Sequence, residues 1–149
     1  MAGFAYRMQN ILNIKLQLEN QAKMEFGRQQ MRLREEQDIL QEYIDRKESY
    51  LEEGRTIRGS VMRASQLREN ANALTAMDEI IELQNEQVAI AEERVEEARA
   101  KLQEVMQERK MHEKLKEKAF EQFMKDENAA EGKAVDELTS YTYGQREDD

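Results

Sequence analysis

The feature that most limits how this chain can fold is the spacing of its apolar residues between Leu74 and Val105. The steps between them alternate three and four residues, and charged side chains fill most positions between. This spacing draws one narrow apolar stripe along an α-helix, and only another helix can cover such a stripe. We therefore expect two helices packed side by side. The stripe consists of Leu74, Met77, Ile81, Gln84, Val88, Ala91, Val95, Ala98, Leu102 and Val105.

A second stripe precedes the first and predicts the partner helix. Most of its steps also alternate three and four, but two consecutive steps of four, Leu18 to Ala22 to Phe26, indicate a stutter that relaxes the supercoil locally. The chain contains no proline, which leaves long helices uninterrupted. The stripe consists of Phe4, Met8, Ile11, Lys15, Leu18, Ala22, Phe26, Gln29, Leu33, Glu36, Leu40, Tyr43, Lys47 and Tyr50.

Two glycines, Gly54 and Gly59, interrupt the helical pattern and predict the turn between the helices. We expect Ser60 or Ser65 to cap the second helix, and a short helix around 61–67 at the tip. The predicted fold is all-α: a long two-helix antiparallel coiled-coil hairpin with an overhanging C-terminal helix. The single coiled-coil domain, 1–149, would have a first helix at about 4–53, a tip at 54–67, a second helix at about 68–138 and a flexible acidic tail at 139–149.

Folding the chain back at the tip places large residues opposite small ones, such as Phe26 opposite Ala98, which fills the space between the helices well. In a parallel homodimer, Glu36 and Lys47 would each meet their own copies, like charge against like. The sequence therefore favours a monomer. The register stays open, because a slide of seven residues would preserve the stripe.

In this register, the second predicted helix extends beyond the first. About twenty of its residues, including Phe120, Phe123 and Met124, are therefore expected to have no cover from the rest of the chain. An uncovered helix is marginal in water and would order on a partner; clustered exposed aromatics mark binding surfaces. Charge is also segregated. Residues 1–35 carry a net charge of +3 and 101–118 carry +2, whereas the net charge of the chain is −9. A solvated coiled-coil surface is the alternative explanation of these clusters.

Several kinds of chemistry are not expected from this composition. The chain has one histidine, His112, no cysteine and no glycine-rich phosphate loop, so we predict no enzyme, no metal site and no cofactor. Basic residues interleaved with glutamates and a negative net charge argue against nucleic acid. No apolar run approaches about 20 residues and no signal peptide is evident, so we expect a cytoplasmic protein.

Two motifs stand near the two ends of the predicted hairpin helices. The first is Phe4-x-Tyr6-Arg7-Met8-Gln-Asn-Ile11-Leu12-x-x-Lys15. The second is Arg109-Lys110-x-x-Glu113-Lys114-Leu115-Lys116-Glu117-Lys118, followed by Glu131 and Asp136-Glu137. Both resemble the flagellar export protein FliJ family, and the resemblance covers the chain in order and length. It implies a small non-enzymatic component of the flagellar type III export apparatus, recruited to the cytoplasmic face of the inner membrane at the flagellar base.

The resemblance also implies partners. Members are similar to the central stalk of rotary ATPases, and they are expected to engage the hexameric export ATPase, to contact the export-gate protein FlhA and to escort export chaperones. The alternative is a generic coiled-coil scaffold or a secretion chaperone that binds export substrates or chaperones. Stimulation of an ATPase ring would favour the stalk.

Two features supply candidate contact residues: the basic end of the hairpin near the chain termini, and the wide apolar face near the start of the second helix. Near its start, Ala73, Met77 and Ile80 make the apolar face wider than a two-helix seam requires, and we predict that they contact the export gate. The candidate ATPase-facing residues are Arg7, Arg28, Arg109, Lys110, Lys114, Lys116, Lys118, Phe120 and Phe123.

Overall fold

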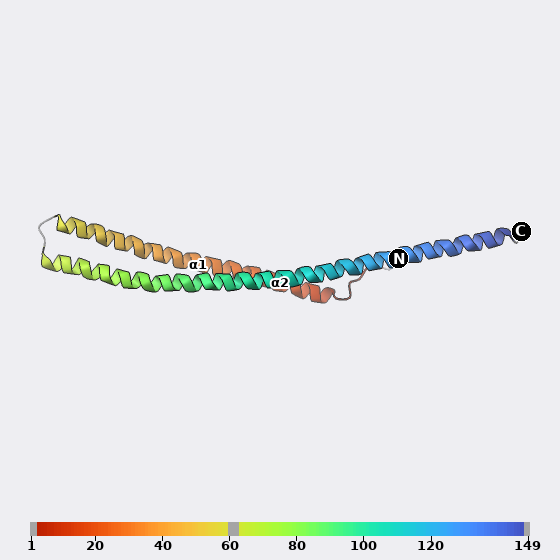
Figure 1. Ribbon diagram of the computed structural model, residues 1–149, viewed down its shortest axis with the longest axis horizontal. Coiled ribbons are helices and arrows are strands. Elements are labelled where there is room, and N and C mark those ends of the chain that lie inside the picture. Colours follow the sequence, from red (N-terminus) through yellow and green to blue (C-terminus); the bar gives the residue numbers. More distant parts are fainter. Residues whose placement is uncertain (1–2, 60–62, 148–149) are drawn as a thin grey trace. The chain divides into compact units, whose positions relative to one another are not determined.

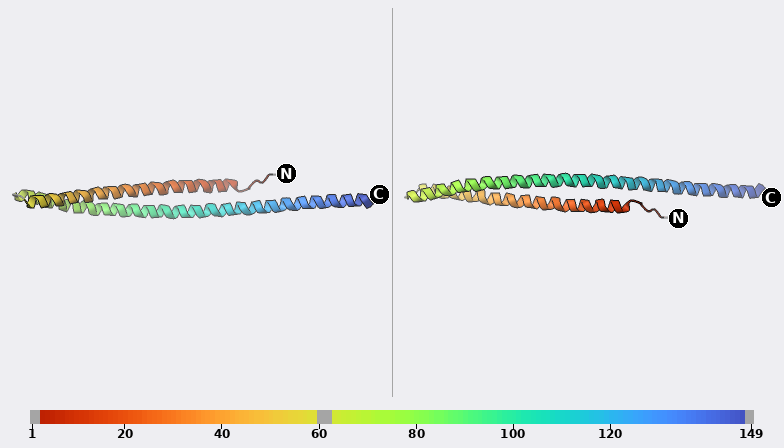
Figure 2. Two further views of the ribbon diagram at one scale, coloured as in Figure 1. Left: turned by 90° about the horizontal axis from the view of Figure 1, so that it is seen from above. Right: turned by 90° about the horizontal axis from the view of Figure 1, so that it is seen from below.

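Two helices make up almost all of the protein. The computed structural model describes residues 3–59 and 63–147. Helix α1 (Gln9–Arg58) and helix α2 (Ala64–Glu147) lie side by side in opposite directions (Figures 1 and 2). No strand occurs within these described residues. The predicted all-α helical hairpin is therefore confirmed.

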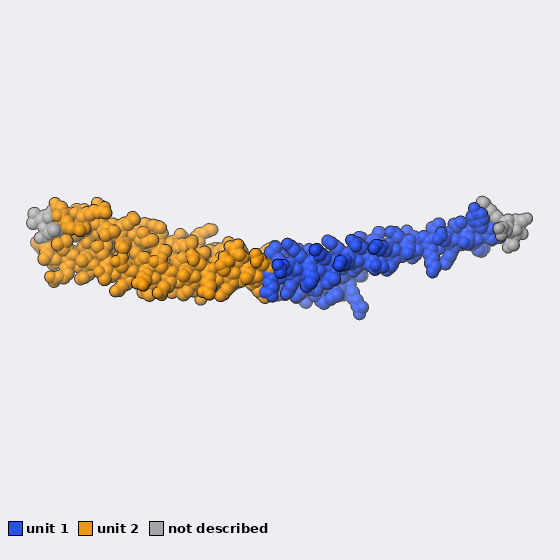
Figure 3. Space-filling view, in the orientation of Figure 1, with its two compact units in different colours: residues 1–19, 104–149 blue, residues 20–103 orange. Residues whose placement is uncertain are grey.

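The chain divides into two compact units, and each helix contributes to both (Figure 3). Unit 1 consists of Met1–Glu19 and Glu104–Asp149, and unit 2 consists of Asn20–Gln103. The sequence analysis expected a single domain.

The seam of unit 2, where the two helices meet, repeats every seven residues along α2. Met77, Gln84, Ala91 and Ala98 are all buried, and Val95 is buried between the last two. Positions seven apart lie on the same face of a helix that is slightly supercoiled around its partner. The stripe predicted for the second helix is therefore confirmed at these positions.

Contacts across unit 2 report the register. Gln84 Nε2 donates hydrogen bonds to the backbone oxygen of Glu36 at 2.9 Å and to its carboxylate at 2.6 Å. The guanidinium of Arg99 lies 5.2 Å from the ring centroid of Phe26. The predicted pairs, such as Phe26 with Ala98, have residue numbers that add up to 123 or 124. The Phe26 contact adds up to 125, which fits the predicted register, whereas the Gln84 contact adds up to 120 because Gln84 reaches Glu36, one turn before the position opposite it in that register.

In unit 1, the seam follows different residues of α1 from those predicted. Leu12 and Glu19 are 3% and 4% exposed, whereas Leu18 is 38% exposed. The inward positions 12, 15 and 19 lead on to 22 in steps of three and four, so the predicted stutter is absent. The prediction that Ile11 and Leu18 face the partner helix was wrong. Leu12 and Glu19 take these inward positions, and the buried charge of Glu19 is tolerated because a cation from the other helix pairs with it.

The turn is also shorter than predicted. Helix α1 continues through Gly54 to Arg58, and α2 already begins at Ala64, so the predicted tip of 54–67 and its separate short helix were wrong. Ser60 lies outside the described residues, and Ser65 lies within the first turn of α2 rather than capping it.

Gly54 does not end the helix but lets the two helices approach each other. A Cβ atom at this position would lie 2.6 Å from Oδ1 of Asn70 on α2. Asn70 Nδ2 in turn donates a hydrogen bond of 2.8 Å to the backbone oxygen of Tyr50. The glycine is therefore explained by close packing in the seam, which its position in the sequence alone did not distinguish from a helix terminator.

Both outer ends of the helices differ from the prediction as well. Helix α1 begins at Gln9 rather than at residue 4, and residues 3–8 form a non-helical N-terminal segment. Helix α2 reaches Glu147, so residues 139–147 are helical rather than a flexible tail. No proline interrupts this end, and glycine within a helix costs only about 1 kcal/mol relative to alanine.

Candidate functional site

An ionic cluster occupies the seam of unit 1. The Arg109 guanidinium donates to both carboxylate oxygens of Glu19 and, at 2.8 Å, to Glu113. Beside it, Lys15 Nζ lies 2.8 Å from a carboxylate oxygen of Glu108. The hydrogen bonds with Glu19 and with Glu113 raise the pKa of Arg109 above its ordinary value. Arg109, a candidate for the ATPase-facing surface, is thus engaged in joining α1 to α2.

Three of the four lysines predicted to face the ATPase form a stripe on α2 within unit 1. Lys110, Lys114 and Lys118 are all exposed and are spaced four residues apart, so they follow one face of the helix. At about 100° per residue, this face points away from the seam residue Val105. Lys116 lies on the seam side and is half-buried.

Three phenylalanines meet on the seam side of α2, next to Lys116 rather than beside the stripe. The N-terminal segment places the Phe4 ring 5.2 Å from that of Phe120, edge to face, and 5.4 Å from that of Phe123. The prediction that Phe120 and Phe123 lack cover within the chain was therefore wrong, although Phe120 remains 45% exposed. Next to these rings is a groove of about 460 Å³. Its lining residues are Phe4, Gln9, Leu12, Leu16, Glu113, Lys116, Glu117 and Phe120.

The opposite flank of unit 1 exposes an apolar patch that the sequence analysis did not identify. Helical geometry places Ile11, Ile14 and Leu18 on the side of α1 away from the groove residue Leu16. On α2, Met111 and Leu115 lie on the corresponding flank. These five patch residues are all exposed, whereas the seam between the two helices contains the charged residues Lys15, Glu19 and Arg109.

The signal for this patch was present in the sequence. Continuing the seven-residue repeat of α1 back from Phe26 leads to Glu19 and Leu12, not to Leu18 and Ile11. Hydrophobicity favoured the second pair, and the repeat favoured the first. Apolar side chains that gather on a surface while charged ones fill the seam are typical of an interface with another protein.

The two remaining arginine candidates lie in different units. Arg7 belongs to the N-terminal segment of unit 1 and is exposed. Arg28 belongs to unit 2, where its guanidinium lies 2.7 Å from the carboxylate of Glu25. The structure thus brings Arg7 and the lysine stripe into the same unit and does not add Arg28 to them.

The candidate export-gate residues of unit 2 differ in accessibility. Met77 is 4% exposed and belongs to the seam, whereas Ile80 is 37% exposed. Ala73 is half-buried and lines a groove near the turn together with Tyr50 and Asn70. Exposed Leu83 and Ile90, which the sequence analysis did not select, lie on the same flank of α2 as Ile80.

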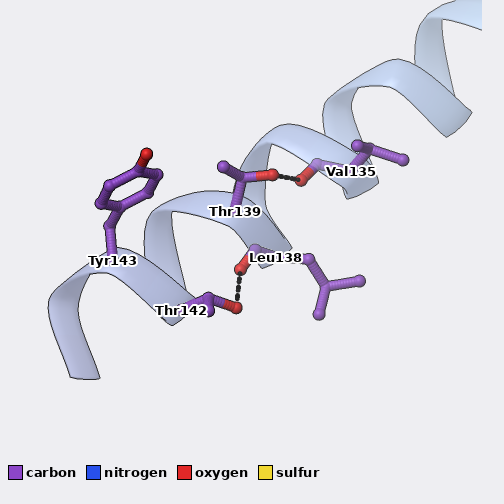
Figure 4. A pocket seen from close by; sticks show the side chains of 5 residues that line it. All are labelled: Val135, Leu138, Thr139, Thr142 and Tyr143. Atoms are coloured by element: carbon purple, nitrogen blue, oxygen red, sulfur yellow. Dashed lines mark hydrogen bonds between the residues drawn. The ribbon is translucent and has the colours of Figure 1, made fainter. Parts of the chain in front are cut away.

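The last part of α2 presents another exposed face in unit 1. Figure 4 shows Val135, Leu138, Thr139, Thr142 and Tyr143, whose spacing of three and four residues places them along one side of the helix. The two threonine hydroxyls donate to backbone oxygens one turn earlier, at 2.9 Å each. Every residue from 128 to 144 is exposed. Residues 128–138 of this segment are the part of the predicted overhang that stays exposed, and residues 139–144 belong to the predicted tail.

The family model of the flagellar FliJ protein matches residues 4–148. The chain belongs to the flagellar FliJ family. The resemblance found in the two sequence motifs is thereby confirmed. No curated protein matches the chain.

A solved structure agrees with the fold of this FliJ-family chain. It is that of CT670 from Chlamydia trachomatis, described as a proposed YscO homolog. The two chains are 20% identical, the match covers 99% of each, and the TM-score is 0.78. At this identity, the comparison supports the helical hairpin and not a particular partner.

Family membership makes this FliJ-family protein a component of the type III export apparatus, in which the family acts without enzymatic activity. Among the described residues, no helix combines the length and the apolar character needed to cross a membrane.

Proposed function

We propose that this FliJ-family protein is a non-enzymatic stalk and escort that binds the hexameric flagellar export ATPase and couples it to the export gate. The observation that carries the proposal is the exposed stripe of Lys110, Lys114 and Lys118 in the same stretch of α2 as the half-exposed Phe120, which lies on another face of the helix. A basic stripe steers a partner of opposite charge, and an aromatic side chain in the same stretch supplies buried area after docking.

The ionic cluster has a structural part in this proposal. Arg109, Glu19 and Lys15 hold α1 against α2 in unit 1, which fixes the positions of the lysines on the outer face of α2. A protein without a catalytic site acts by binding one state of its partner better than another. A defined docking surface is what allows such a preference.

The second contact would be made by unit 2. Ile80, Leu83 and Ile90 form an exposed apolar flank of α2, and we assign the export-gate protein FlhA to this flank. Met77 is left out of the contact set because it is already buried in the seam. Through these partners, the protein would be held in the cytoplasm at the flagellar base, peripheral to the membrane, and would be available to export chaperones.

Charge reversal of the stripe tests the ATPase contact. The triple variant Lys110→Glu, Lys114→Glu and Lys118→Glu should abolish stimulation of the purified export ATPase, and the wild-type effect should weaken as salt is added. Full stimulation by the triple variant would refute the assignment. The matched control reverses three exposed arginines of unit 2, Arg32, Arg34 and Arg46, and so makes the same change in net charge.

One observation favours the alternative of a chaperone for export substrates. Met24 and Met31 are highly exposed on α1 of unit 2, and flexible methionine side chains adapt to many apolar partners. If the protein binds unfolded export substrates and does not stimulate the ATPase, this alternative replaces the stalk. Replacing both methionines with glutamine would then abolish substrate binding.

A further inference from the structure

The N-terminal segment covers a surface to which the proposed function assigns a partner. Residues 3–8 precede α1 and are not helical, yet Phe4 packs on Phe120 and Phe123 of α2, both within unit 1. Figure 1 shows this segment leaving the start of α1 and running along α2. The aromatic cluster is therefore occupied by the protein's own chain.

The cover is incomplete and weakly held. Phe120 is still exposed despite the contact with Phe4. The Tyr6 hydroxyl oxygen is buried but has no hydrogen-bond partner among the described residues. Burying a hydroxyl without a partner opposes the closed position, because its hydrogen bonds with water are lost and not replaced. Residues 3–6 also lack the regular backbone hydrogen bonds of a helix, although the backbone oxygen of Tyr6 accepts one from the Gln9 N–H at 3.1 Å.

We propose that residues 3–8 form a strap that covers Phe120 and Phe123 in the free protein and is displaced when the ATPase ring binds. The inference rests on the proposed function, since the ATPase hexamer is the partner assigned to the side chains of Phe120 and Phe123. The strap makes the free protein a weaker binder, because only molecules with an open strap can dock through the aromatic cluster. It also shields apolar surface until the partner is present.

Two substitutions should change ring binding in opposite directions. Phe4→Ala removes the side chain that holds the strap closed; if the strap is closed about nine-tenths of the time, this variant should bind the ring about tenfold more tightly. Tyr6→Phe removes the buried hydroxyl, which has no hydrogen-bond partner among the described residues, and keeps the aromatic side chain. This variant should hold the strap closed more firmly and bind less tightly than the wild type.

The position of the strap can be measured separately from affinity. The chain has no cysteine, so nitroxide labels can be placed specifically at Ala5→Cys and Glu121→Cys, two exposed positions. Pulsed electron paramagnetic resonance should give one short distance in the free protein. Adding the ATPase ring should lengthen it, and Phe4→Ala should lengthen it without the ring.

The outcomes separate the strap from the proposed function. If the ring binds and the label distance stays short, or if Phe4→Ala binds no better than the wild type, the strap is overturned. Weaker binding by Phe4→Ala would overturn it as well, because Phe4 would then be part of the docking surface. If neither the wild type nor any variant binds the ring, the proposed function fails, and a short distance in the free protein would describe a strap without that partner.

Discussion

Met77 and Ile80 allow a sharp test of which residues hold the helices together and which are free for a partner. They are three residues apart on α2 in unit 2, and the sequence analysis assigned both to the export gate. Met77 is 4% exposed and Ile80 is 37% exposed. Replacing each with alanine should therefore have different effects on the free energy of unfolding.

The cost of Met77→Ala can be worked out from its burial. The change removes three heavy atoms beyond Cβ from the seam, and each buried group of this size contributes about 0.8 kcal/mol. The sum is about 2.4 kcal/mol, and a residual void would increase it. A seam between two helices can close in part around the gap, so we expect a loss of about 2–3 kcal/mol. For Ile80→Ala we expect less than about 1 kcal/mol, since part of its surface is already exposed.

Urea and thermal unfolding, followed by far-ultraviolet circular dichroism, would measure both changes. For a chain of this size, a loss of 1 kcal/mol lowers the midpoint by about 2–4 °C, so Met77→Ala should lower it by about 5–10 °C. The same preparations should be tested for binding to the export gate. Ile80→Ala should weaken that binding with little loss of stability. Equal midpoints for the two variants would refute the burial of Met77 and the division of roles.

Three further predictions concern other parts of the molecule. In an Asn70→Ala background, Gly54→Ala should raise the free energy of unfolding by about 1 kcal/mol. With Asn70 present, the gain should be smaller or reversed, because the new Cβ would meet Oδ1 of Asn70. Equal effects of Gly54→Ala in the two urea titrations would contradict the close contact. Replacing either Glu19 or Arg109 with leucine should lower the urea midpoint markedly, because the remaining charge loses its partner. Replacing both should restore the midpoint. A double variant less stable than both single variants would contradict this reasoning. Truncation after Glu127 should leave the thermal midpoint unchanged, because residues 128–144 are all exposed, and a lower midpoint would show that they stabilise the rest of the chain.

The sequence by itself determined the pair of helices, their antiparallel order and the residues of α2 that face the seam in unit 2. Each follows from a property that is repeated many times along the chain. The spacing of three and four residues recurs from Met77 to Val105, no proline interrupts it, and one glycine-containing break allows the chain to turn back. A single unusual residue such as Gln84 does not change such a pattern, because the residues around it all favour the same face.

The tertiary structure alone decided the details that depend on a single distant partner. Glu19 enters the seam in place of Leu18 because Arg109, ninety residues later, neutralises its charge. Gly54 stays within a helix because Asn70 lies against it, and the segment before α1 lies along α2 because Phe4 packs on Phe120 and Phe123. Periodicity describes which face a residue occupies on its own helix, but it does not contain the charge, size or position of the atoms that this face will meet.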